Sequence, residues 1–129
     1  MMKKTVLIVD DSIPMRFLLE SFVGKKYKVF SAMDGLTAMM WLAKGNVPDI
    51  IVTDIQMPGM SGWELIKYLS GNALYDDIPV IVLSASQIEE APVELRMKLT
   101  EFVSKPFDPI KLVDLVDKHV EMPKLTVQQ

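Results

Sequence analysis

The sequence predicts an α/β fold in which a doubly wound parallel sheet carries helices on both faces. Short runs rich in β-branched residues alternate five times with longer amphipathic stretches, the pattern of a right-handed, doubly wound domain. The runs at 7–9, 50–52 and 80–83 are continuously apolar, as expected for strands covered on both faces. The five predicted strands are Thr5–Val9, Tyr27–Ser31, Ile50–Thr53, Val80–Leu83 and Phe102–Ser104.

The segment after the first strand predicts an amphipathic helix. Ser12 stands where a helix cap is expected, directly before the periodic residues. The apolar stripe follows the spacing i, i+3, i+4, i+7 and consists of Met15, Leu18, Leu19 and Phe22. This stripe is therefore expected to face the core.

Three further helices are marked by residues that cap them. Asp34 precedes the second helix, and Gly45 ends it. Ser61 and Glu64 have the spacing of a capping box at the start of the third helix. Asp108, followed by a proline, opens the last helix.

The fourth helix is the least regular. A helix that began near residue 86 would contain Pro92 in its interior, where proline removes a hydrogen bond and costs about 3 kcal/mol. We therefore expect Pro92 to begin this helix and residues 86–91 to form a loop or a single turn.

Length and composition restrict the function classes. The 129 residues predict one domain over residues 1–121, with a tail or the start of a linker at 122–129. The sequence contains no cysteine, which excludes disulfides and thiolate chemistry. No apolar stretch approaches the roughly 20 residues of a membrane span, and a net charge of -3 argues against a general nucleic-acid surface. We expect a cytoplasmic protein that binds neither membranes nor nucleic acid directly.

Polar residues stand at the carboxyl ends of four predicted strands. Asp10 and Asp11 follow the first strand, Asp54 the third, Ser84 the fourth and Lys105 the fifth. Ligands of open α/β sheets bind at this edge. Any one of these residues alone is as easily a turn or loop residue, but together they predict a single site.

The chemistry of these side chains indicates phosphoryl transfer. Three neighbouring carboxylates repel each other unless a cation is present, and hard oxygen ligands favour Mg²⁺. Asp54 would be the nucleophile that forms an acyl phosphate. Lys105 would pair with Asp54 at rest and with a phosphoryl oxygen later, and Ser84 would donate a hydrogen bond to another oxygen.

Four stretches of the sequence occur in a characteristic order. They are 6–12 (VLIVDDS), 54–62 (DIQMPGMSG), 84–85 (SA) and 105–107 (KPF). Together they resemble the CheY-like receiver domains of two-component response regulators, and the resemblance covers about residues 4–119.

The resemblance implies a flavodoxin-like sheet of five strands in the order 2-1-3-4-5. It implies that a sensor histidine kinase or a phosphotransfer protein phosphorylates Asp54, and that a downstream effector binds the face of the fourth helix, fifth strand and fifth helix. It further implies a signalling domain whose chemistry is limited to self-phosphorylation and slow autodephosphorylation. The implied state is a monomer or a weak, phosphorylation-dependent dimer.

The resemblance also implies roles for individual residues. The implied Mg²⁺ ligands are Asp10, Asp11, Asp54 and the backbone carbonyl of Gln56. The implied contacts to the phosphoryl group are Ser84 and Lys105. Phe102 occupies the position of an aromatic switch that acts with Ser84, and the Lys105–Pro106 bond is expected to be cis.

The sequence departs from the family pattern in two places. Residues 98–101 stand where a Gly-Ala pair is common, and Pro92 alters the fourth helix. Both departures lie on the expected signalling face, so they leave the partner-binding surface undefined.

The alternative function is a degenerate receiver that docks to a partner without phosphorylation. A haloacid dehalogenase-type phosphatase is disfavoured, because that family requires an acid two residues after the nucleophile, where Gln56 stands.

Overall fold

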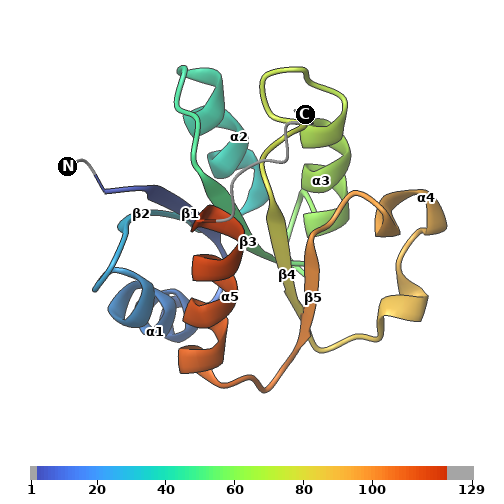
Figure 1. Ribbon diagram of the computed structural model, residues 1–129. Coiled ribbons are helices and arrows are strands. Elements are labelled where there is room, and N and C mark those ends of the chain that lie inside the picture. Colours follow the sequence, from blue (N-terminus) through green and yellow to red (C-terminus); the bar gives the residue numbers. More distant parts are fainter. Residues whose placement is uncertain (1–2, 122–129) are drawn as a thin grey trace, which may run out of the picture.

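The strands hydrogen-bond in the order β2-β1-β3-β4-β5, all in parallel, in the computed structural model, which describes residues 3–121 (Figure 1). The strands are β1 (Thr5–Val9), β2 (Lys28–Ala32), β3 (Ile50–Asp54), β4 (Val80–Ser84) and β5 (Glu101–Ser104). The helices are α1 (Ile13–Val23), α2 (Gly35–Ala43), α3 (Gly62–Ser70), the 3-10 turn η1 (Ile88–Glu90), α4 (Val93–Arg96) and α5 (Pro109–Glu121). This order confirms the predicted fold class; the expected tail at 122–129 lies outside the described residues.

Two apolar cores lie on opposite faces of the sheet. In Figure 1, α1 and α5 lie together on one face, and α2 and α3 cover the other. Neighbouring strand residues alternate between the cores: Leu7 belongs to the core under α2 and α3, and Ile8 to the core under α1 and α5. This alternation follows from the two-residue period of a strand and explains why the central strands read as continuously apolar.

The ends of several strands differ from the prediction by one residue. Tyr27 is not in β2, because its backbone N–H donates to the carbonyl of Val23 (3.0 Å) and completes the turn after α1. At the other end, β3 and β4 extend to Asp54 and Ser84. These two polar residues are thus the last residues of their strands, and the sheet itself fixes their backbone.

The predicted caps of the first three helices are confirmed. Ser12 Oγ accepts a hydrogen bond from the N–H of Met15 (3.3 Å), and Asp34 accepts one from Thr37 (2.8 Å). Ser61 and Glu64 form the complete capping box. Each bond satisfies a backbone N–H that the helix leaves unpaired at its start.

The region of the fourth helix confirms the effect of Pro92. A 3-10 turn comes first, Pro92 occupies the N-cap, and α4 is only four residues long. The guanidinium of Arg96 donates to the carbonyls of Glu89 (2.5 Å) and Ala91 (3.3 Å), which holds the turn against the helix.

None of the helices in the described part of the chain is both long and apolar enough to cross a membrane.

Candidate functional site

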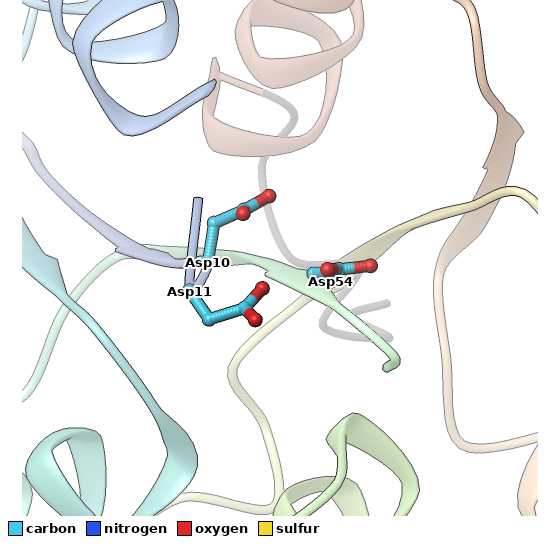
Figure 2. A group of neighbouring side chains, drawn as sticks. All are labelled: Asp10, Asp11 and Asp54. Atoms are coloured by element: carbon cyan, nitrogen blue, oxygen red, sulfur yellow. The ribbon is translucent and has the colours of Figure 1, made fainter. Parts of the chain in front are cut away.

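Three carboxylates meet at the carboxyl edge of the sheet. Oxygens of Asp10, Asp11 and Asp54 all lie within 4.8 Å of one another (Figure 2). Asp10 and Asp54 are buried, whereas Asp11 is exposed. The register of the sheet explains the grouping, because Val9 at the end of β1 pairs with Thr53 and places the residues that follow each of them side by side.

Gly62 sets the position of the backbone around Asp54. A Cβ atom at Gly62 would lie 2.3 Å from the Asp54 carbonyl oxygen and 2.8 Å from Cα of Ile55. The N–H of Gly62 donates to the carbonyl of Ile55 (2.8 Å). The start of α3 therefore packs directly on the end of β3, an approach that leaves no room for a side chain.

Lys105 adds a positive charge to the carboxylates. Its Nζ lies 3.3 Å from Asp54 Oδ1 and 3.8 Å from Asp10 Oδ2. The backbone N–H of Lys105 donates to the carbonyl of Ser84 (2.9 Å), which fixes the residue to the end of β4. The Lys105–Pro106 bond is cis, as the resemblance implied.

Asp10 carries a buried oxygen that lacks a hydrogen-bond donor. Its Oδ1 accepts from the N–H of Ser12 (2.8 Å), but its Oδ2 has no hydrogen-bond partner among the described residues. Burial raises the pKa of the Asp10 carboxyl, and the charge of Asp54 also raises it, against the lowering effects of the Ser12 bond and of Lys105. A buried carboxylate oxygen that accepts no hydrogen bond is costly, and Lys105 Nζ, 3.8 Å away, is too far to donate one. This oxygen is therefore suited to coordinate a cation.

The site fits Mg²⁺. Three carboxylates and one lysine leave excess negative charge in a partly buried group of side chains. The donors are hard oxygens, which Mg²⁺ prefers, and Mg²⁺ needs only one or two protein carboxylates because it retains waters. Asp54 Oδ1 is itself held by the N–H of Ile55 (2.7 Å), so the candidate nucleophile has a fixed orientation.

Ser84 and Phe102 line one cavity of about 220 Å³. Ser84 is buried, and its Oγ accepts a hydrogen bond from the N–H of Ser86 (2.9 Å). Gln56 and Trp63 also line this cavity. The structure therefore gathers Asp10, Asp11, Asp54 and Lys105 in one group and places Ser84, Gln56 and Phe102 around an adjoining space.

Sequence reasoning missed two residues that shape the site, Arg16 and Gly62. In the sequence, Gly62 is only the last residue of the 54–62 motif, and its close approach to Asp54 arises from the packing of α3 on β3. The guanidinium of Arg16 donates to the backbone carbonyl of Asp10 (2.7 Å). A cation in the first turns of a helix opposes the helix dipole, and this was the one available signal that Arg16 has a special contact.

The fold and the acidic site are those of a CheY-like signalling domain. The family model of the response regulator receiver domain matches residues 6–117, and the chain belongs to this family. The predicted family is thus confirmed.

Several known proteins are similar to this chain. The sporulation initiation phosphotransferase F of Bacillus subtilis is 35% identical over 127 residues, which cover 95% of this chain and 98% of that protein. Response regulator GtcR of Aneurinibacillus migulanus is 35% identical over 87% of this chain, but the match spans only 46% of GtcR. For a hybrid signal transduction histidine kinase of Dictyostelium discoideum, the match spans only 8% of the relative.

Solved structures agree with the observed fold. Response regulator protein TrrA of Thermotoga maritima, in complex with Mg(2+)-BeF, superposes with a TM-score of 0.79 at 29% identity, covering 90% of this chain and 98% of that one. Chemotaxis protein CheY4 of Vibrio cholerae gives a TM-score of 0.77 at 28% identity, with coverage of 90% and 98%.

Proposed function

We propose that this protein is a phosphorylation-switched receiver in which Asp54 accepts a phosphoryl group in a Mg²⁺-dependent reaction. The observation that carries the proposal is the convergence of three carboxylates with Lys105 at the carboxyl edge of the sheet. Phosphoryl transfer needs mainly positioning and charge neutralisation, and this group of side chains offers both.

In the proposed reaction, a carboxylate oxygen of Asp54 attacks the phosphorus of a phosphohistidine. A P–O bond forms, the P–N bond breaks, and the imidazole of the donor leaves with the electron pair. Mg²⁺, held by Asp10, Asp11, Asp54 and the backbone carbonyl of Gln56, would supply charge neutralisation for the phosphoryl oxygens. Lys105 would pair with a second phosphoryl oxygen, and the hydroxyl of Ser84 would donate to a third.

We further propose that the phosphoryl donor is a sensor histidine kinase or a phosphotransfer protein. The similarity to sporulation initiation phosphotransferase F supports this partner class, since that match covers nearly the whole length of both proteins. Other matches span only 8% and 46% of longer proteins, so they support the role of the domain and not the activity of a whole protein. The domain limits of 1–121 and the cytoplasmic location remain predictions.

The output of the proposed switch would be read on the face formed by α4, β5 and α5. Ser84 and Phe102 line one cavity, so a movement of the hydroxyl toward a phosphoryl oxygen would change the space beside the ring. The short α4 limits how much helical surface this face offers. A downstream effector is the proposed partner, and the protein is proposed to be a monomer or a weak, phosphorylation-dependent dimer.

Labelling with a small phosphodonor tests the proposal. With Mg²⁺ and acetyl phosphate, Asp54 should displace acetate and gain one acid-stable, base-labile phosphoryl group, measured by intact-mass spectrometry. Asp54→Ala should abolish the added mass. Asp114→Ala is the matched control, because Asp114 is an exposed carboxylate of α5, and it should label like the parent.

Two outcomes would contradict the proposal. A phosphoryl group that remains on a serine or histidine of Asp54→Ala would refute the acyl-phosphate mechanism. A folded parent that takes up no phosphoryl group with Mg²⁺ present would favour the alternative of a degenerate receiver that docks without phosphorylation.

A further inference from the structure

Arg16 reaches from α1 back to the loop that carries two of the site carboxylates. Its Nη1 donates to the backbone carbonyl of Asp10 at 2.7 Å, in a partly buried position. Arg16 is the fourth residue of α1 after the Ser12 cap. The contact is therefore a bond from a side chain to the backbone and does not involve either carboxylate group of the loop.

Further hydrogen bonds close the loop around this contact. The N–H of Asp10 donates to the carbonyl of Ala32 (3.1 Å), and its Oδ1 accepts from the N–H of Ser12 (2.8 Å). The carbonyl of Ser12 accepts from the N–H of Arg16 (2.9 Å). Asp11 thus lies between two residues whose backbones are anchored, and Arg16 supplies the anchor on the Asp10 carbonyl.

The charge of Arg16 works against the site that it borders. A cation near the start of a helix opposes the helix dipole, and a fixed positive charge beside the carboxylates disfavours a second cation there. If charge were its only effect, removal of Arg16 would tighten Mg²⁺ binding. If the hydrogen bond to Asp10 matters more, removal would weaken binding, so the two effects have opposite signs.

We propose that Arg16 is a positioning residue for the metal site. Its bond to the Asp10 carbonyl holds the 10–12 loop so that the carboxylates of Asp10 and Asp11 are oriented before Mg²⁺ binds. This role rests on the proposed function, because it assumes that these carboxylates hold Mg²⁺. It adds to that function a residue that touches neither the metal nor the phosphoryl group.

A Mg²⁺ titration followed by backbone amide NMR tests the role of Arg16. In Arg16→Met, we expect the Kd for Mg²⁺ to rise about tenfold, since loss of a residue that orients a metal ligand typically costs 10–100-fold in affinity. Arg16→Lys keeps the charge but lacks the planar guanidinium, so its Kd should lie between those of the parent and Arg16→Met. Ser21→Ala is the matched control, because the Ser21 hydroxyl also bonds a backbone carbonyl on α1, that of Phe17, away from the site.

The labelling rate at increasing Mg²⁺ separates positioning from a direct role in transfer. With acetyl phosphate, Arg16→Met should need more Mg²⁺ for half-maximal labelling but reach the rate of the parent at saturation. Binding of Mg²⁺ to Arg16→Met as tight as, or tighter than, in the parent would overturn the proposal, and so would a rate that stays low at saturating Mg²⁺.

Two further results keep the test decisive. If Arg16→Met does not fold, as judged by its NMR spectrum in EDTA, the Arg16→Lys variant decides, and an unchanged Kd in that variant overturns the proposal. If the parent itself shows no Mg²⁺-dependent shifts at residues 10–12 and 54, the proposed function fails together with the inference. Normal binding by the parent and unchanged binding by the Arg16 variants would overturn only the role of Arg16.

Discussion

Lys105 Nζ lies 3.3 Å from Asp54 Oδ1, although Asp54 ends β3 and Lys105 follows β5, two strands that are not neighbours in the sheet. Strand β4 separates β3 from β5, and the lysine side chain crosses its end. Lys105 can do so because its N–H is bonded to the carbonyl of Ser84, the last residue of β4. One ammonium group thus faces three carboxylates, so the site keeps a net negative charge. The first two predictions follow from this charge.

Mg²⁺ should stabilise the folded protein. A metal that binds only the folded state adds RT ln(1 + [L]/Kd) to the free energy of unfolding, which is about 2.7 kcal/mol at a hundredfold excess over Kd. Thermal melts in EDTA and in MgCl₂ measure this effect, with NaCl of equal ionic strength as the control. A melting temperature that does not respond to Mg²⁺ would argue against the metal site.

Asp54→Asn should melt at a higher temperature than the parent when both are in EDTA. Two like charges about 4 Å apart repel by roughly 1 kcal/mol even in water, and the substitution removes the repulsion of Asp54 with Asp10 and Asp11 while it loses one ion pair with Lys105. We expect an increase of a few degrees. Asp114→Asn, which changes an exposed carboxylate, is the control; a lower melting temperature for Asp54→Asn alone would contradict the prediction.

Gly62→Ala should destabilise the protein and disturb Asp54 at the same time. The added Cβ would meet backbone atoms at 2.3 and 2.8 Å, and overpacking of this kind typically costs about 1–3 kcal/mol. Chemical denaturation measures the stability, and acetyl phosphate labelling measures the effect on Asp54. Gly71→Ala is the matched control, because its Cβ would have no neighbour closer than 3.5 Å; equal effects of the two substitutions would refute the steric explanation.

Asp117 should stabilise the fold in a pH-dependent way. Burial acts to raise the pKa of its carboxyl, but hydrogen bonds from Lys26 and Tyr27 and the charge of Lys26 together hold that pKa below its ordinary value of 3.8. A lowered pKa in the folded state means that the contribution is fully present above pH 3.8 and is lost as the pH falls through the lowered value.

The comparison of the parent with Asp117→Asn measures this contribution. The variant should lose about 2 kcal/mol of unfolding free energy at neutral pH, the scale of hydrogen bonds to a charged group. Urea titrations from pH 7 to pH 3 measure the difference in unfolding free energy between the two proteins. The other carboxylates contribute equally to both proteins, so their effects cancel in this difference. The difference should be constant down to about pH 4 and shrink below it; a difference that grows toward low pH would contradict the assignment.

Ser84→Ala should uncouple phosphorylation from the response of Phe102. A beryllofluoride mimic on Asp54 should shift amide resonances of residues 84–99 and 102–104 in the parent more than those of α2. The Ser84 hydroxyl is buried and lines one cavity with Phe102. Acetyl phosphate should still label Asp54 in the variant, but the shifts around Phe102 should largely vanish. Backbone NMR on both proteins decides, and identical shifts around Phe102 would show that the hydroxyl is not the trigger.

Much of the site could be predicted because it depends on strand ends. Asp10, Asp54 and Lys105 each stand at or next to the end of a strand, and in a parallel sheet all such ends meet at one edge. The caps at Ser12 and Asp34 were equally predictable, since a cap and its helix are adjacent in the chain. The start of α4 also had a local cause in Pro92, and the 3-10 turn before it is one of the two structures expected for residues 86–91.

The sequence by itself therefore determined the fold class, the sheet order through the family resemblance, and the set of chemical groups at the site. Only the tertiary structure decided that Arg16 bonds the Asp10 carbonyl, that Gly62 packs on the backbone of Asp54, and that the Tyr27 hydroxyl bonds Asp117. Local signals arise from neighbours along the chain and can be read from it. These three contacts join segments whose separation is set by the packing of helices on the sheet, and a distance of that kind exists only once the chain has folded.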